Sequence, residues 1–138
     1  MREPERGAVT VFVTILTVAL LAMAGLVTDG GRILAARREA GNVAESAARA
    51  GAQAIDLRVL RQQNQIALDP NEAKLRANDY LTTAGYRGDV QADTLHVHVV
   101  VVITRPTLLL GATGFHDFTV RSTGDATPIR GITTEATP

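Results

Sequence analysis

The chain has 138 residues, no cysteine, and 14 basic against 14 acidic side chains. The lack of cysteine excludes a disulfide, a thiolate nucleophile and a zinc site with cysteine ligands. Zero net charge without a basic cluster argues against nucleic-acid binding, which needs a local excess of basic residues to neutralise phosphates.

An uncharged apolar run over residues 7–28 dominates the N-terminal part of the chain. As a helix rising 1.5 Å per residue it spans about 33 Å, which matches the hydrocarbon core of a bilayer. Its threonine hydroxyls can bond back to helix carbonyls, so they do not oppose insertion into lipid. We therefore predict a transmembrane helix over residues 7–28, preceded by a short cytoplasmic N-terminus, residues 1–6. A buried core helix fits less well, because the remaining chain has too little apolar surface to cover it.

The same run also has features of a cleavable signal peptide. Arg2 and Arg6 precede it, and Ala22-Met23-Ala24 has the small-x-small pattern of a cleavage site. Cleavage after Ala24 would release a small secreted α+β binding module. Against cleavage, residues 26–27 continue the apolar run beyond the cut.

Processing after Gly7 by a prepilin-type peptidase is a further alternative. Such sites usually have a glutamate five residues past the cut, and this chain has Phe12 there. The sequence therefore favours a segment that is retained.

An alanine-rich helix is predicted over residues 29–66. Apolar residues recur there at alternating steps of three and four, the spacing of one helix face that packs on a partner. Small side chains allow close approach of backbones. The partner is either the chain's own distal domain or another subunit. The residues on this stripe are Ile33, Ala36, Ala40, Val43, Ala47, Ala50, Ala54 and Leu57.

A second helix is predicted over residues 70–84. Asp69 as N-cap, Pro70 at the first position and Glu72 at the third form a capping box, and Gly85 suits a left-handed C-cap. The residues expected on one side of this helix are Ala73, Ala77, Tyr80, Leu81 and Ala84.

After Gly88 the hydrophobic period changes to two. It predicts strands at about residues 89–92, 94–104 and 117–124, in a small antiparallel sheet with a helix across it. The middle strand is apolar on both faces in its second half, which is typical of a strand covered on both sides. The fold class is therefore α+β, with a distal domain over residues 70–127 and a loose tail, residues 128–138. The apolar loop 106–115 is expected either to plug one end of the domain or to touch a neighbouring subunit or the membrane surface.

Catalytic and metal-binding signals are weak. His96 and His98 share a strand face, and His116 follows the next loop, which makes these three the only candidates for metal ligands. Strand histidines more often serve as half-exposed packing residues, so no metal or other cofactor is predicted. The sequence shows no Ser-His-Asp context, no glycine-rich phosphate loop and no paired carboxylates. We predict no enzyme activity and no small-molecule substrate.

The order of these features resembles the TadE/TadG-like proteins of Flp (Tad) pilus assembly loci, in their actinobacterial form. The resemblance is carried by Arg6-Gly7-Ala8-Val9, by residues 26–32 ending in Asp29-Gly30-Gly31-Arg32, and by the alanine-rich residues 35–38 and 44–52. The Pro70 helix, the valine-rich strand and the Pro-Thr-Leu-Leu-Leu-Gly loop are similar as well. Asp29-Gly30-Gly31-Arg32 at the membrane exit is the most specific part.

The resemblance implies a minor pilin or pseudopilin-like structural subunit without cofactor or turnover. Its partners would be membrane lipid, other pilin or pseudopilin subunits and pilus assembly proteins. The same resemblance and the short N-terminal tail favour a cytoplasmic N-terminus and an extracytoplasmic C-terminal domain. The basic residues beyond the span, at positions 32, 37 and 38, outnumber Arg2 and Arg6 and by themselves favour the opposite orientation.

Asp29 lies where the predicted helix leaves lipid, three residues before Arg32. An isolated charge near hydrocarbon is costly, so the carboxylate should be paired, either with Arg32 or with a basic residue of a neighbour. One hypothesis is that this pair sets the register of assembly. The alternative is a plain interfacial anchor with Gly30-Gly31 as a flexible joint. The predicted interface residues are Asp29, Gly30, Gly31, Arg32, Ala36, Ala40, Val43, Ala47, Ala50 and Ala54.

Overall fold

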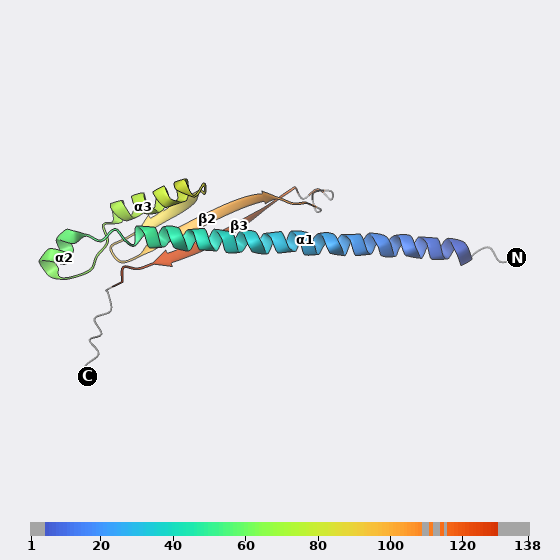
Figure 1. Cartoon of the computed structure of the whole chain (residues 1–138), viewed down its shortest axis with the longest axis horizontal. Helices are drawn as coiled ribbons and strands as arrows, with labels where there is room; N and C mark the ends of the chain where they lie inside the picture. The colour runs from blue at the N-terminus through green and yellow to red at the C-terminus, as the bar shows by residue number, and fades with distance from the viewer. Residues whose placement is uncertain (1–4, 109–110, 112–113, 115, 130–138) are drawn as a thin grey trace, which may run out of the picture. The chain divides into compact units, whose positions relative to one another are not determined.

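The computed structural model describes residues 5–108, 111, 114 and 116–129. It contains three helices followed by three strands, which confirms the α+β class (Figure 1). The contacts divide the chain into two compact units, one of residues 1–36 with 104–119 and one of residues 37–103 with 120–138. The elements are α1 Glu5–Gly51, α2 Leu57–Gln63, α3 Pro70–Thr83, β1 Gly88–Ala92, β2 Val97–Pro106 and β3 Asp117–Ala126.

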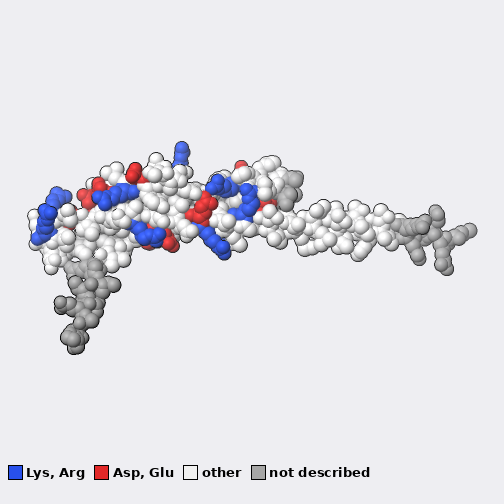
Figure 2. All heavy atoms as spheres, viewed as in Figure 1, with Lys and Arg blue, Asp and Glu red and all other residues white. Residues whose placement is uncertain are grey.

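The first unit holds the apolar part of α1. This helix is long and apolar enough to cross a membrane, and Figure 2 shows its apolar stretch free of charged side chains on the face in view. The hydroxyls of Thr14, Thr17 and Thr28 each donate to the carbonyl four residues earlier, at 2.8 Å. As expected, these hydroxyls find their acceptors within the helix itself.

The strands form one sheet in the order β1-β2-β3, and the second unit contains β1, residues 97–103 of β2 and residues 120–126 of β3. β1 pairs antiparallel with β2, from Gly88 opposite Val101 to Ala92 opposite Val97. On one face of β2 positions 97, 99, 101 and 103 are buried, whereas Val102 on the other face is 39% exposed. The prediction of a strand covered on both faces is therefore wrong: β2 is central in the sheet, but only one face is covered.

The C-terminal part of α1 lies against the covered face of this sheet. A Cβ atom added at Gly124 of β3 would come within 2.3 Å of the carbonyl carbon of Ala44. The Ser122 hydroxyl donates to the Arg37 carbonyl at 3.1 Å, which ties the same strand to the helix. Helix and strand backbones therefore approach closely because both carry small residues at the contact.

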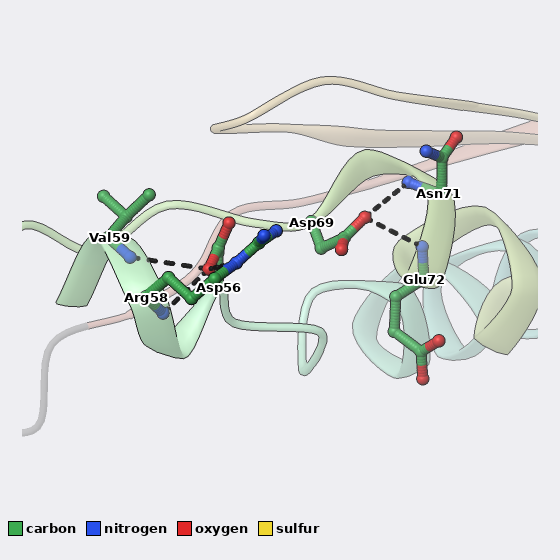
Figure 3. A network of polar contacts seen from close by, with 6 residues as sticks. All are labelled: Asp56, Arg58, Val59, Asp69, Asn71 and Glu72. Atoms are coloured by element: carbon green, nitrogen blue, oxygen red, sulfur yellow. Dashed lines mark hydrogen bonds and ion pairs between the residues drawn. The ribbon is translucent and has the colours of Figure 1, made fainter. Parts of the chain in front are cut away.

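α1 ends at Gly51, so the prediction that it continues to residue 66 is wrong. A Cβ atom at Gly51 would lie 2.9 Å from the carbonyl oxygen of Ala73 in α3, so the chain turns where it meets that helix. Ile55 then forms an isolated antiparallel bridge with Leu68. Between these bridge residues Asp56 caps a separate short helix, α2, by accepting from the N–H groups of residues 58 and 59 (Figure 3).

The N-cap of α3 is confirmed. The Asp69 side chain accepts from the N–H groups of Asn71 and Glu72 at 3.0 and 3.2 Å (Figure 3). The reciprocal half of the predicted capping box is absent from the described structure: the Asp69 N–H donates to the Ala54 carbonyl, and Glu72 accepts from Arg76. Of the predicted packing face, positions 73, 77 and 81 are buried, whereas positions 80 and 84 are exposed.

We expect Asp69→Ala to lower the free energy of unfolding of the domain by about 1 kcal/mol, because two helix N–H groups lose their acceptor. Amide hydrogen exchange of residues 71–73 in the full chain measures the loss. Asp79→Ala, on the exposed side of the same helix, is the matched control. Equal loss of protection in the two variants would contradict a capping role.

The predicted strand 94–104 begins later, at Val97, because a turn precedes it. The Asp93 carboxylate accepts from the N–H groups of Leu95 and His96 at 2.7 and 2.8 Å. These two hydrogen bonds hold the pKa of the Asp93 carboxyl below its usual value, and the bond from the Leu95 N–H has the larger effect. Leu95, which precedes the strand, is 52% exposed.

The other two predicted strands are present as β1 and β3. On β3 Val120 is buried and Phe118 and Ser122 are half-buried. The predictions for most of the apolar loop and for the tail concern residues 109–110, 112–113, 115 and 130–138, which lie outside the described residues.

Candidate assembly site

Asp29 is the buried centre of the predicted site. Its side chain is 1% exposed, and α1 places it one turn after Gly25, which is also buried. The Asp29 Oδ1 atom accepts the backbone N–H of Leu108 at 3.0 Å. The Asp29 carboxylate thus holds the backbone just after β2, and both residues belong to the first unit.

Arg32, one of the two partners considered for Asp29, does not bind it in the described structure. In the described residues no ion pair joins it to Asp29, and its Nη1 atom is buried without a hydrogen-bond partner. An arginine three residues further along a helix was the nearest candidate in sequence, but the backbone N–H of Leu108 lies closer in space. The contact of the Asp29 carboxylate with Leu108 joins residues that are 79 positions apart in the sequence.

Gly30 and Gly31 lie inside α1, which continues through them without interruption. A Cβ atom at either position would meet nothing within 4 Å in the described structure. The two glycines are therefore required neither by close packing in this chain nor by a backbone conformation that only glycine adopts.

We expect Gly30→Ala and Gly31→Ala each to stabilise α1 by about 0.5–1 kcal/mol, because alanine loses less conformational entropy in a helix. Slower amide exchange of the neighbouring helical residues measures the gain. Exchange that is equally fast or faster in the variants would contradict this expectation.

The alanine stripe packs largely inside this chain. Ala40 and Ala47 are fully buried, Ala54 is 2% exposed and Ala36 is 4% exposed. Val43 and Ala50, the other predicted interface residues, are half-buried. In the second unit the stripe and its neighbours Ala44 and Ala48 lie on the covered face of the sheet, so the intramolecular seam is one of its uses.

Two further contacts of the second unit were not anticipated from the sequence. The Tyr86 hydroxyl donates to the Glu39 carboxylate at 2.5 Å, 47 positions apart, and so links α1 to the turn before β1. The second is the close approach of Gly124 to Ala44. The sequence around Gly124 gives no sign of this contact, because a lone glycine in a strand is compatible with many environments.

The three histidines are not gathered into one site. His98 Nδ1 lies 2.6 Å from the Asp125 carboxylate, and His96 Nδ1 lies 3.6 Å from that of Asp93. The His116 carbonyl accepts from the N–H of Thr107 at 2.9 Å. Among the described residues no group of three metal-ligating side chains comes together.

Comparison with known proteins supports the predicted family. Residues 7–54 match the family model described as putative Flp pilus-assembly TadE/G-like. No curated protein and no solved structure matches the chain. The matched segment covers the apolar run, the Asp29 site and the alanine stripe, and ends just after α1.

This match confirms the resemblance over the N-terminal part of the chain. The family is a structural type associated with pilus assembly and not a class of enzymes. Residues 7–54, about a third of the chain, are thus similar to the Flp pilus-assembly TadE/G-like family.

Proposed function

We propose that this protein is a membrane-anchored minor pilin or pseudopilin-like subunit of a Flp-type pilus or related secretion apparatus. One observation carries the proposal: the segment that matches the pilus-assembly family forms a single helix that is apolar and exposed before Asp29 and buried against its own domain after it. The first part of α1 is thereby available to lipid and to other subunits, and the second part holds the folded domain.

The exposed part of α1 suits a mechanism based on packing. A helix that is apolar on all sides is stable only in lipid or among other apolar helices. Large apolar side chains such as Phe12, Leu21 and Val27 are each more than 60% exposed. The partners we propose are membrane lipid, other pilin or pseudopilin subunits and pilus assembly proteins, and the mechanism needs neither cofactor nor catalysis.

The proposed orientation places residues 1–6 in the cytoplasm and the α+β domain outside. The single apolar span in α1 suits this arrangement. Basic residues lie on both sides of the apolar run, so the orientation needs a test of its own. Protease protection of the domain in sealed, right-side-out vesicles would contradict an external position.

Release of a secreted module after Ala24 is the competing outcome. α1 is continuous through residues 22–24, and the apolar face continues to Val27. The intact mass of the native protein tests this directly. We expect residues 1–24 to be retained, and a mass that begins at Gly25 would contradict the anchor.

A gene deletion in the native host tests the assembly role. We expect the mutant to lose or shorten its pili in electron micrographs, with recovery when the wild-type gene is restored. Photocrosslinkers at exposed positions of the apolar run should capture pilus subunits. The same probe at Asp79, on the exposed side of α3, is the matched control. Normal pili in the deletion mutant would overturn the proposed function.

A further inference from the structure

Leu108, just after β2, is an apolar residue whose backbone is bound to Asp29 of α1. The side chain is 62% exposed, and the backbone N–H donates to Asp29 at 3.0 Å. The preceding residue, Thr107, donates its N–H to the His116 carbonyl at 2.9 Å. Leu108 is therefore exposed while its own backbone N–H and that of the preceding residue are held by hydrogen bonds.

This point coincides with the end of the apolar run. Asp29 is the first charged residue after residues 7–28, so it lies about 1.5 Å beyond the run along the helix axis. Gly25 is buried, whereas residues 21–24 and 26–28 are exposed. Burial on α1 therefore extends from Asp29 to a position one turn inside the apolar run.

Polarity changes along the same part of the first unit. The hydroxyls of Thr104 and Thr119 lie 3.0 Å apart, and His116 and Asp117 are exposed. Leu108 then presents an apolar side chain at the level of Asp29. This order suits a bilayer surface, where polar groups stay among water and headgroups and apolar side chains enter the acyl boundary.

We propose that Leu108 makes a second membrane contact, inserting into the boundary between headgroups and acyl chains of the bilayer that α1 crosses. The inference rests on the proposed membrane anchor. The span sets the depth of Asp29, and the hydrogen bond from Leu108 to Asp29 transfers that depth to the end of the β2–β3 hairpin. Two contacts, one through the bilayer and one at its surface, restrict tilting of the first unit.

Fluorescence quenching in nanodiscs that hold one full-length chain tests this contact. The natural chain lacks cysteine, so Leu108→Cys, Leu16→Cys and Leu95→Cys each accept a single environment-sensitive label. Leu95 is the matched control, since it is an exposed leucine before the other end of β2. We expect lipid-borne quenchers to act on labels at 16 and 108, and aqueous iodide to act on the label at 95.

The outcomes separate the contact from the anchor. Iodide quenching at 108 with protection at 16 would overturn the contact and leave the anchor intact. Iodide quenching at 16 would overturn both. Protection at 108 from both quenchers would indicate cover by protein and would also overturn the contact. Adding Asp29→Ala to the Leu108→Cys variant should increase iodide quenching, and unchanged lipid quenching would overturn the positioning role of Asp29.

Discussion

Gly124→Val should lower the free energy of unfolding of the domain by about 3 kcal/mol, near the upper end of the usual range for overpacked cores. The added Cβ would lie 2.3 Å from the backbone of Ala44 and Glu45. Backbone atoms of a helix cannot move aside as the end of a flexible side chain does, so β3 and α1 would have to separate. Native-state hydrogen exchange of β3 in detergent micelles measures the change.

Gly41→Ala is the matched control for this substitution. Gly41 lies on α1, the helix that Gly124 contacts, and in the same unit. Its added Cβ would meet the Ser122 Cβ at an ordinary 4.0 Å. We expect it to stabilise the domain by about 0.5–1 kcal/mol. If Gly124→Val unfolds no more readily than the wild-type chain, the close contact between α1 and β3 is wrong.

Arginine at both Leu16 and Leu20 should largely abolish membrane insertion. Each arginine at the centre of a spanning helix costs about 2.5–3.5 kcal/mol, so the pair costs about 5–7 kcal/mol. Both leucines are exposed in the chain, at 46% and 54%, so the substitutions disturb no internal packing. Resistance to alkaline extraction and flotation with liposomes measure insertion.

Leu34→Arg with Ala35→Arg controls for added charge on the same helix. Both positions are exposed and lie beyond Asp29, outside the apolar run. We expect this variant to stay in the membrane fraction. If the Leu16 and Leu20 variant also remains inserted, residues 7–28 are not the anchor.

Local patterns were sufficient to predict several elements. Asp69 and Pro70 start α3 because capping depends on groups only two or three residues away. Alternation with period two located β2 and its buried face, since side chains alternate across any strand. The family resemblance was likewise readable from residues 26–32 and the alanine pattern, and the match over residues 7–54 confirms it.

Other features depend on residues that are distant in sequence. α1 stops at Gly51 where it meets the backbone of Ala73, and the alanine pattern alone gives no sign of this end. The one-sided cover of β2 likewise follows from where the helices of its unit pack. Periodicity records which residues face a partner but not which partner they face.

The apolar run and its charged end were determined by the sequence alone, because insertion in lipid and helix formation depend on composition over a continuous segment. The tertiary structure decided what Asp29 does. Its acceptor atom binds an N–H 79 positions away, and a nearer residue, Arg32, had the more obvious charge. The same holds for the alanine stripe, whose small side chains suit any close partner. Only the tertiary structure places Gly124 of β3 against Ala44, a neighbour of this stripe on α1.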